Sequence, residues 1–285
     1  MTLTSSVPDA GAPDARARGA AAAGSARAAG ADAAAGAVVD AAVGAAVGAF
    51  PAGPGEPPSD CPLCAGALEP MPGMPGYVRH RSTRLSERCA LTTHHHQPDE
   101  LTVRGARDVR VSARHRARFV EQWERHYVLV RRVWPAFTMS RFTTVLACAD
   151  VQDLWSYPSL RDDDLAAVLL ALAGFIRVRD ERAPTDPEPD GDAVRWVRFW
   201  FEARVRDVGD LWTAGTDAPR LFRVDYREPL TTLFPTGAQV QAWQPVDGVR
   251  DAWAQLDAAP MPDIAPSDHA AFARFVARAP MRDWA

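Results

Sequence analysis

The first 58 residues limit the domain that this chain can build, because they consist largely of Ala, Gly, Pro and Ser. Such a composition offers too little apolar surface to offset the entropy lost when a chain becomes ordered. We therefore predict a disordered, low-complexity leader over residues 1–58. The residues that follow, up to position 285, are enough to enclose one hydrophobic core without disulfide bonds.

Residues 112–285 mix helical and strand patterns and predict an α+β domain of helices and antiparallel sheet. A helix is predicted over residues 112–134, where aromatic and aliphatic side chains recur every three or four positions. Ser112 is its expected N-cap, and Pro135 its end. Acidic residues after Ser159 and the serine at 267 predict two further helix starts. Further helices are expected over residues 150–157, 165–173, 248–256 and 268–279.

Strands are predicted where β-branched and aromatic residues are concentrated. Residues 142–148 fit either a strand or a helix. A β-hairpin is predicted around the acidic, turn-rich loop 183–192. The strands expected in the chain span residues 101–103, 109–111, 175–182, 193–206, 221–227 and 239–244.

A Cys-x2-Cys pair, Cys61 and Cys64, opens a stretch that is rich in Pro and Gly and has no helical or strand period. Two cysteines at this spacing place two thiolates on one tight turn, as in a zinc knuckle. Cys89 is a third candidate ligand, and one of the adjacent histidines His94, His95 and His96 is a candidate fourth. The sequence thus predicts a zinc-stapled, basic module over residues 59–111.

The expected role of this zinc is structural, because four protein ligands leave no open coordination position. A catalytic zinc with a bound water is the alternative if one cysteine is not a ligand. A third interpretation is a set of free thiols beside a surface histidine run.

Positive charge is concentrated in residues 79–141, which contain 14 Arg and six acidic residues, in a chain whose net charge is −4. The chain has no Lys, so its basic side chains are Arg and His. This asymmetry indicates either a polyanionic partner or internal pairing between the two parts of the chain. On the predicted helix, Arg114, Arg116 and Arg118 are candidate contacts to such a partner.

The predicted strand 193–206 has two different faces, because side chains alternate along a strand. Val197, Phe199, Phe201, Ala203 and Val205 form the expected core face. The opposite face could stack nucleic-acid bases and bind phosphates, or could lie under a helix with ordinary cation–π packing. Its candidate partner-binding residues are Trp196, Arg198, Trp200 and Arg204.

Phosphate-binding glycine loops, nucleophile elbows and dinucleotide fingerprints are missing from the sequence, so no catalytic residue is assigned. The first hypothesis is a non-enzymatic regulatory or adaptor protein that engages nucleic acid or an acidic protein. A zinc-dependent hydrolase or nuclease is the second, and a host-directed protein-interaction module is the third. The sequence also predicts a soluble, intracellular protein without a membrane span, located in the cytoplasm or, in a eukaryotic host, the nucleus.

Overall fold

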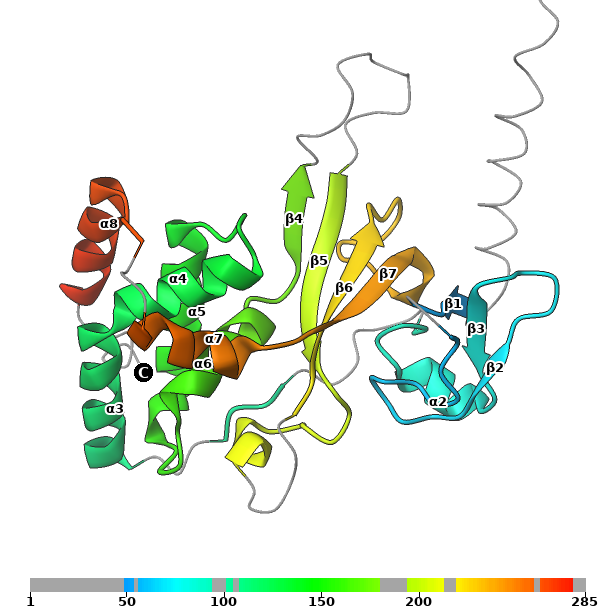
Figure 1. Cartoon of the computed structure of the whole chain (residues 1–285), viewed down its shortest axis with the longest axis horizontal. Helices are drawn as coiled ribbons and strands as arrows, with labels where there is room; N and C mark the ends of the chain where they lie inside the picture. Colours follow the sequence, from blue (N-terminus) through cyan, green and yellow to red (C-terminus); the bar gives the residue numbers. More distant parts are fainter. Residues whose placement is uncertain are drawn as a thin grey trace, which may run out of the picture. The chain divides into compact units, whose positions relative to one another are not determined.

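Figure 1 presents the computed structural model of the chain, which describes residues 49–53, 56–93, 101–104, 108–179, 194–212, 219–258 and 262–278. The described residues all belong to one compact unit, Gly44–Ala285. Most of the predicted leader, the three adjacent histidines and the predicted loop 183–192 lie outside the described residues.

An antiparallel sheet with the strand order β4-β5-β6-β7 runs through this unit. It confirms the predicted hairpin, because Ile176 of β4 pairs with Val197 of β5. β6 has the predicted bounds, whereas β5 ends at Phe201, before the predicted end. The strands are β4 (Ile176–Arg179), β5 (Val194–Phe201), β6 (Leu221–Arg227) and β7 (Val240–Val246).

Helices cover one face of this sheet (Figure 1). The alternation predicted for β5 is confirmed, because Val197, Phe199 and Phe201 are buried in the core that the helices share with the sheet. Within the described ranges, none of the helices is both long and apolar enough to cross a membrane. The helices are α3 (Val109–Glu121), α4 (Trp123–Val133), α5 (Met139–Val151), α6 (Asp162–Leu172), α7 (Val249–Ala258) and α8 (Pro266–Val276).

The start of α3 corrects two predictions. Residues 109–111 form its first turn and not a strand, because the carboxylate of Asp108 caps the helix. Its Oδ1 accepts hydrogen bonds from the backbone N–H groups of Arg110 and Val111, at 2.9 and 3.1 Å. Ser112 therefore lies inside the helix. The predicted helix is also divided at Gln122, where neither Gly nor Pro marks a break in the sequence.

Other helix ends differ from prediction as well. Residues 142–148 belong to α5, which Thr138 caps by accepting from the backbone N–H of Arg141. The helix predicted over residues 150–157 is split, since Asp153 has a left-handed φ of 65° before the 3₁₀ segment η1 (Leu154–Ser156). The expected serine caps are wrong: Arg161 precedes α6 and Ala265 precedes α8, neither with a capping side chain.

A smaller antiparallel sheet lies at the N-terminal end of the described chain and has the order β1-β3-β2. β1 lies within the predicted leader, so the predicted boundary at residue 58 is wrong. The side chain of Phe50 in β1 is only 1 % exposed, because it packs in a hydrophobic cluster with residues of both sheets. We call described residues 49–53 and 56–93 the N-terminal module. It comprises β1 (Ala49–Pro51), β2 (Leu68–Pro70), β3 (Tyr77–His80) and α2 (Thr83–Arg88).

The module covers the face of the large sheet that is opposite the helices. A second hydrophobic cluster joins Leu68, Val78 and Leu91 of the module to residues of the large sheet, among them Trp200, Phe222, Tyr226 and Trp243. The indole of Trp243 donates a hydrogen bond to the carbonyl oxygen of Pro51 at 2.8 Å. The large sheet therefore has one hydrophobic cluster on each face.

Candidate metal centre and adjoining cavity

The Cys-x2-Cys pair forms a tight turn in the N-terminal module. The backbone N–H of Ala65 donates to the carbonyl oxygen of Cys61 at 2.8 Å, and Ala65 has a left-handed φ of 54°. Gly66 comes next in the chain, at a position where nearby side chains leave little room for a Cβ atom. A Cβ at this position would lie 3.0 Å from Cδ2 of His80 and 3.2 Å from Sγ of Cys64. The local sequence thus brings Cys61, Cys64 and His80 together.

The donor atoms of Cys61, Cys64, His80 and Cys89 all lie within 4.8 Å of one another. His80 ends β3, and Cys89 directly follows α2. The Sγ atoms of Cys61 and Cys89 are 3.7 Å apart, close to the edge of about 3.8 Å that a tetrahedron with metal–sulfur bonds of roughly 2.3 Å requires. Sγ of Cys64 lies 3.1 Å from Nε2 of His80. Three sulfurs and one imidazole in this geometry could bind a metal ion.

The hydroxyl of Thr92 sets the tautomer of His80. It donates its single hydrogen to the carbonyl oxygen of Ser86 at 2.6 Å. Because that hydrogen is used, the hydroxyl can only accept in its longer, 3.4 Å contact with Nδ1 of His80. A ring proton therefore lies on Nδ1, which leaves Nε2 as the ring atom that would bind a metal ion together with the three sulfurs. Outer-sphere partners of this kind orient the histidine ligands of metal sites.

The three thiols change one another's acidity. Hydrogen bonds from Cys61 and Cys89 hold the pKa of the Cys64 thiol well below its ordinary value. The same contact with Cys64 raises the pKa of Cys61 to about 12, and the hydrogen bonds of Cys89 with Cys61 and Cys64 also raise the pKa of Cys89. The metal-free cluster is thus one thiolate flanked by two thiols. A metal ion that binds all three sulfurs must displace the remaining two protons.

Three of the predicted ligands, Cys61, Cys64 and Cys89, lie in the cluster, and His80 is a fourth candidate ligand that was not predicted from the sequence. His80 is sixteen residues after Cys64 and nine before Cys89, between the two halves of the predicted site. The histidines predicted as the fourth ligand, His94, His95 and His96, follow Cys89 and lie outside the described residues. The available signal was the spacing of Val78 and His80, two positions apart, which places His80 on the same face of a strand as an apolar residue. Both side chains are buried in the structure.

The three arginines predicted on α3 have different surroundings. Arg116 is held internally by two hydrogen bonds to the carboxylate of Asp150, at 2.7 and 3.0 Å. Arg118 forms an ion pair with Asp162, and the side chain of Arg114 is exposed. Two of the three thus meet acidic residues outside the basic stretch.

The predicted Arg/Trp face of β5 lies against the module. Arg198 is 4 % exposed, and its guanidinium carbon lies 4.0 Å from the centroid of the Trp200 ring. Trp200 is also buried and donates a hydrogen bond to the hydroxyl of Tyr226 at 3.1 Å. The partly buried Trp196 donates to Glu228 at 2.5 Å. Arg204, beyond the strand end, is exposed and pairs with Glu202 at 2.7 Å.

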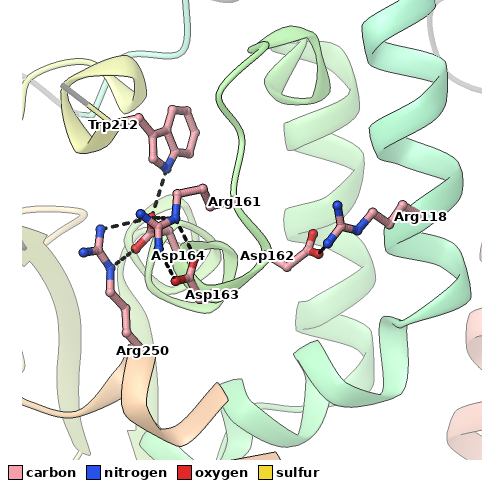
Figure 2. A network of polar contacts seen from close by, with 7 residues as sticks. All are labelled: Arg118, Arg161, Asp162, Asp163, Asp164, Trp212 and Arg250. Carbon is pink, nitrogen blue, oxygen red and sulfur yellow. Dashed lines mark hydrogen bonds and ion pairs between the residues drawn. The ribbon is translucent and has the colours of Figure 1, made fainter. Parts of the chain in front are cut away.

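Three consecutive aspartates at the start of α6 bind arginines (Figure 2). The buried Asp164 accepts hydrogen bonds from Nε of Arg250 at 2.5 Å and from the indole of Trp212 at 2.9 Å. Asp163 pairs with Arg161, and Asp162 pairs with Arg118 on α3. This network fastens α6 to α3, α7 and the 3₁₀ segment η2 (Val208–Trp212).

A cavity of about 960 Å³ adjoins the metal-ligand cluster and is lined by Cys64 and Cys89 of the module. Its other walls come from residues 101–104 and from residues 198–201 of β5. The charged residues that line it are Arg88, Arg104, Arg198, Arg206 and Asp207. Arginine thus accounts for four of the five charged residues in the lining, and we call this the cationic cavity.

Comparison of the chain with models of protein families, with curated proteins and with solved structures finds no match.

Proposed function

We propose that this protein is a non-enzymatic adaptor that binds an acidic protein partner, and that its Cys₃His cluster holds a structural zinc ion. Three sulfurs and one imidazole are a common ligand set for structural zinc. Four protein ligands complete a tetrahedron and leave no position for a reactive water, which argues against a zinc hydrolase. Bound zinc would supply folding free energy to the module.

The observation that carries the partner proposal is the arrangement of arginines around the cavity. Arg88 comes from α2, Arg104 from the segment after the module, and Arg206 from the segment after β5. Side chains of all three are exposed. Guanidinium groups bind carboxylates through paired, charge-assisted hydrogen bonds, so such a cluster favours an acidic ligand.

A protein partner is preferred over nucleic acid because of the buried Arg/Trp face. Stacking of nucleic-acid bases needs exposed aromatic surfaces, and Trp200 is covered by the module. Arg116 and Arg118 pair with acidic residues of the chain itself.

Metal analysis and binding titrations test the proposal. We expect about one zinc ion per chain, and its loss in Cys61→Ser. Fluorescently labelled polyglutamate should bind the zinc-loaded protein more tightly than a twelve-nucleotide thymidine oligomer does at the same ionic strength. Arg84 is an exposed arginine one turn before Arg88 on α2, and it does not line the cavity. Arg84→Gln combined with Arg88→Gln should weaken that binding about tenfold.

The matched control is Arg274→Gln with Arg278→Gln, which removes two exposed arginines at the same spacing from the C-terminal end of α8. This control should bind polyglutamate like the unmodified protein. Preferential binding of the oligomer, or equal effects of both variant pairs, would overturn the acidic-partner proposal. A protein free of metal but with an unchanged module would overturn the zinc proposal.

A further inference from the structure

One edge of β5 lacks a strand partner at the C-terminal end of the strand. β4 pairs with β5 only from Val194 to Val197, whereas β6 pairs with it as far as Phe201. Among the described residues, positions 198–201 thus have a neighbouring strand on one side only. Such an edge presents backbone N–H and C=O groups to which another chain can bind.

The hydrogen-bond pattern decides which residues present these groups. The N–H of Glu202 donates to the carbonyl oxygen of Arg220 at 3.0 Å, one step beyond the pair of Phe201 with Leu221. Hydrogen-bonded pairs alternate along an antiparallel ladder, so residues 198, 200 and 202 bond to β6. Phe199 and Phe201 therefore direct their backbone groups to the opposite edge, as Val197 does where it meets β4.

This open edge lies in the cationic cavity. Residues 198–201 all line the cavity, together with the exposed arginines Arg88, Arg104 and Arg206. The one acidic residue in the lining, Asp207, is engaged by the hydroxyl of Tyr157 and the N–H of Gly209, both at 2.8 Å. Backbone groups and positive charge thus occur side by side.

We propose that an extended, acidic segment of a partner protein adds to β5 as a further strand in this cavity. Its backbone would pair with Phe199 and Phe201, and its carboxylates would bind Arg88, Arg104 and Arg206. The open edge spans residues 198–201, about 13 Å at the rise of a strand. This inference rests on the acidic-partner proposal and names the site and the binding mode.

Peptides with blocked backbone groups test the mode of binding. The probe is a fluorescein-labelled hexapeptide of alternating glutamate and valine, titrated into the zinc-loaded full chain. Two analogues carry N-methyl groups, one on the glutamates and the other on the valines, and both keep the charge. Strand addition uses the N–H groups of alternate residues, so one analogue should bind at least about tenfold more weakly. The other should bind within about threefold of the parent peptide.

Protein variants test the site. Arg206→Gln should weaken hexapeptide binding about tenfold, and Ala203→Phe, which fills part of the cavity, should abolish it. Arg204→Gln is the matched control, because Arg204 is an equally charged, exposed neighbour that does not line the cavity. The affinity of Arg204→Gln for the hexapeptide should stay within about twofold of that of the unmodified protein. Circular dichroism and the zinc content of each variant establish that the fold is retained.

The outcomes separate this inference from the proposal on which it rests. If polyglutamate binds but both methylated analogues bind like the parent, strand addition is overturned and the acidic-partner proposal stands. Equal losses in Arg206→Gln and Arg204→Gln would overturn the cavity as the site. If no acidic peptide binds the zinc-loaded protein, both proposals fall.

Discussion

At the scale of single residues, the buried His126 is the clearest source of pH-dependent stability. It is 0 % exposed and lies between the rings of Phe119 and Trp253, with centroid distances of 4.7 and 4.6 Å. Neither ring nitrogen has a hydrogen-bond partner among the described residues. Burial, together with the charges of Arg125 and Arg118, lowers the pKa of His126 to about 3.

This histidine should make the protein less stable as the pH falls below about 6.5, the pKa of the unfolded chain. Between pH 6.5 and 3 the unfolded chain binds a proton that the folded protein excludes, so protonation favours unfolding. The free energy of unfolding should fall by about 2 kcal/mol between pH 7 and pH 5 from this residue alone. Urea titrations of the zinc-loaded protein at both pH values measure the difference.

His126→Phe keeps an aromatic ring between Phe119 and Trp253 but cannot be protonated. The free energy of unfolding of this variant should therefore fall by about 2 kcal/mol less than that of the unmodified protein between pH 7 and pH 5. Zinc release and carboxylate titration contribute equally to both proteins and cancel in the comparison. Identical pH dependence of the two proteins would contradict the assignment.

At the scale of elements, β5 carries both hydrophobic clusters, one on each face. Phe199 packs with the helices, and Trp200 packs with the module. Trp200→Ala should therefore lower the free energy of unfolding by about 3–5 kcal/mol, as much as Phe199→Ala. Trp196→Ala, on the same face but only partly buried, should cost less. Urea denaturation of the three variants measures this, and a mild Trp200→Ala would mean that the module does not cover this face.

The sequence predicted elements best where the local pattern was strong and unambiguous. β6 was placed to the residue, and α6 was recognised because its apolar residues continue around the helix. The break at Gln122 was missed because neither Gly nor Pro marks it in the sequence. The short strand at Phe50 was missed because its partner, β3, is distant in the sequence.

The candidate metal-ligand cluster was predicted only in part. The Cys61–Cys64 spacing is a local signal, whereas the choice of His80 depends on the pairing of β3 with β1 and β2. The cavity could not be predicted at all. It needs β4 to begin only at Ile176, which leaves residues 198–201 of β5 without a partner on that side, and it needs residues 101–104 to lie alongside Asp207. No periodic pattern in the sequence indicates either feature.

At the scale of the whole molecule, the module and the helices depend on the sheet in different ways. The cluster between helices and sheet is extensive and includes α3 to α8. The cluster beneath the module is smaller, and it contains Cys61 and Cys89. Gly237 lies so near the module that a Cβ there would be 2.4 Å from the carbonyl carbon of Thr92. Contact this close requires a module held in one conformation, which a metal centre can provide.

Metal removal should therefore release the module before the rest of the domain unfolds. In Cys61→Ser, or with a chelator, amide hydrogens of β3 and α2 should exchange at least about a hundredfold faster, because a weakened local opening equilibrium controls their protection. Amides of α6 should keep most of their protection, since their cluster lies on the other face of the sheet. Hydrogen exchange followed by mass spectrometry resolves the two regions. Cys148→Ser, which alters an exposed cysteine outside the cluster, is the control and should leave both regions unchanged. Equal loss of protection in both regions would mean that the two clusters unfold as one unit.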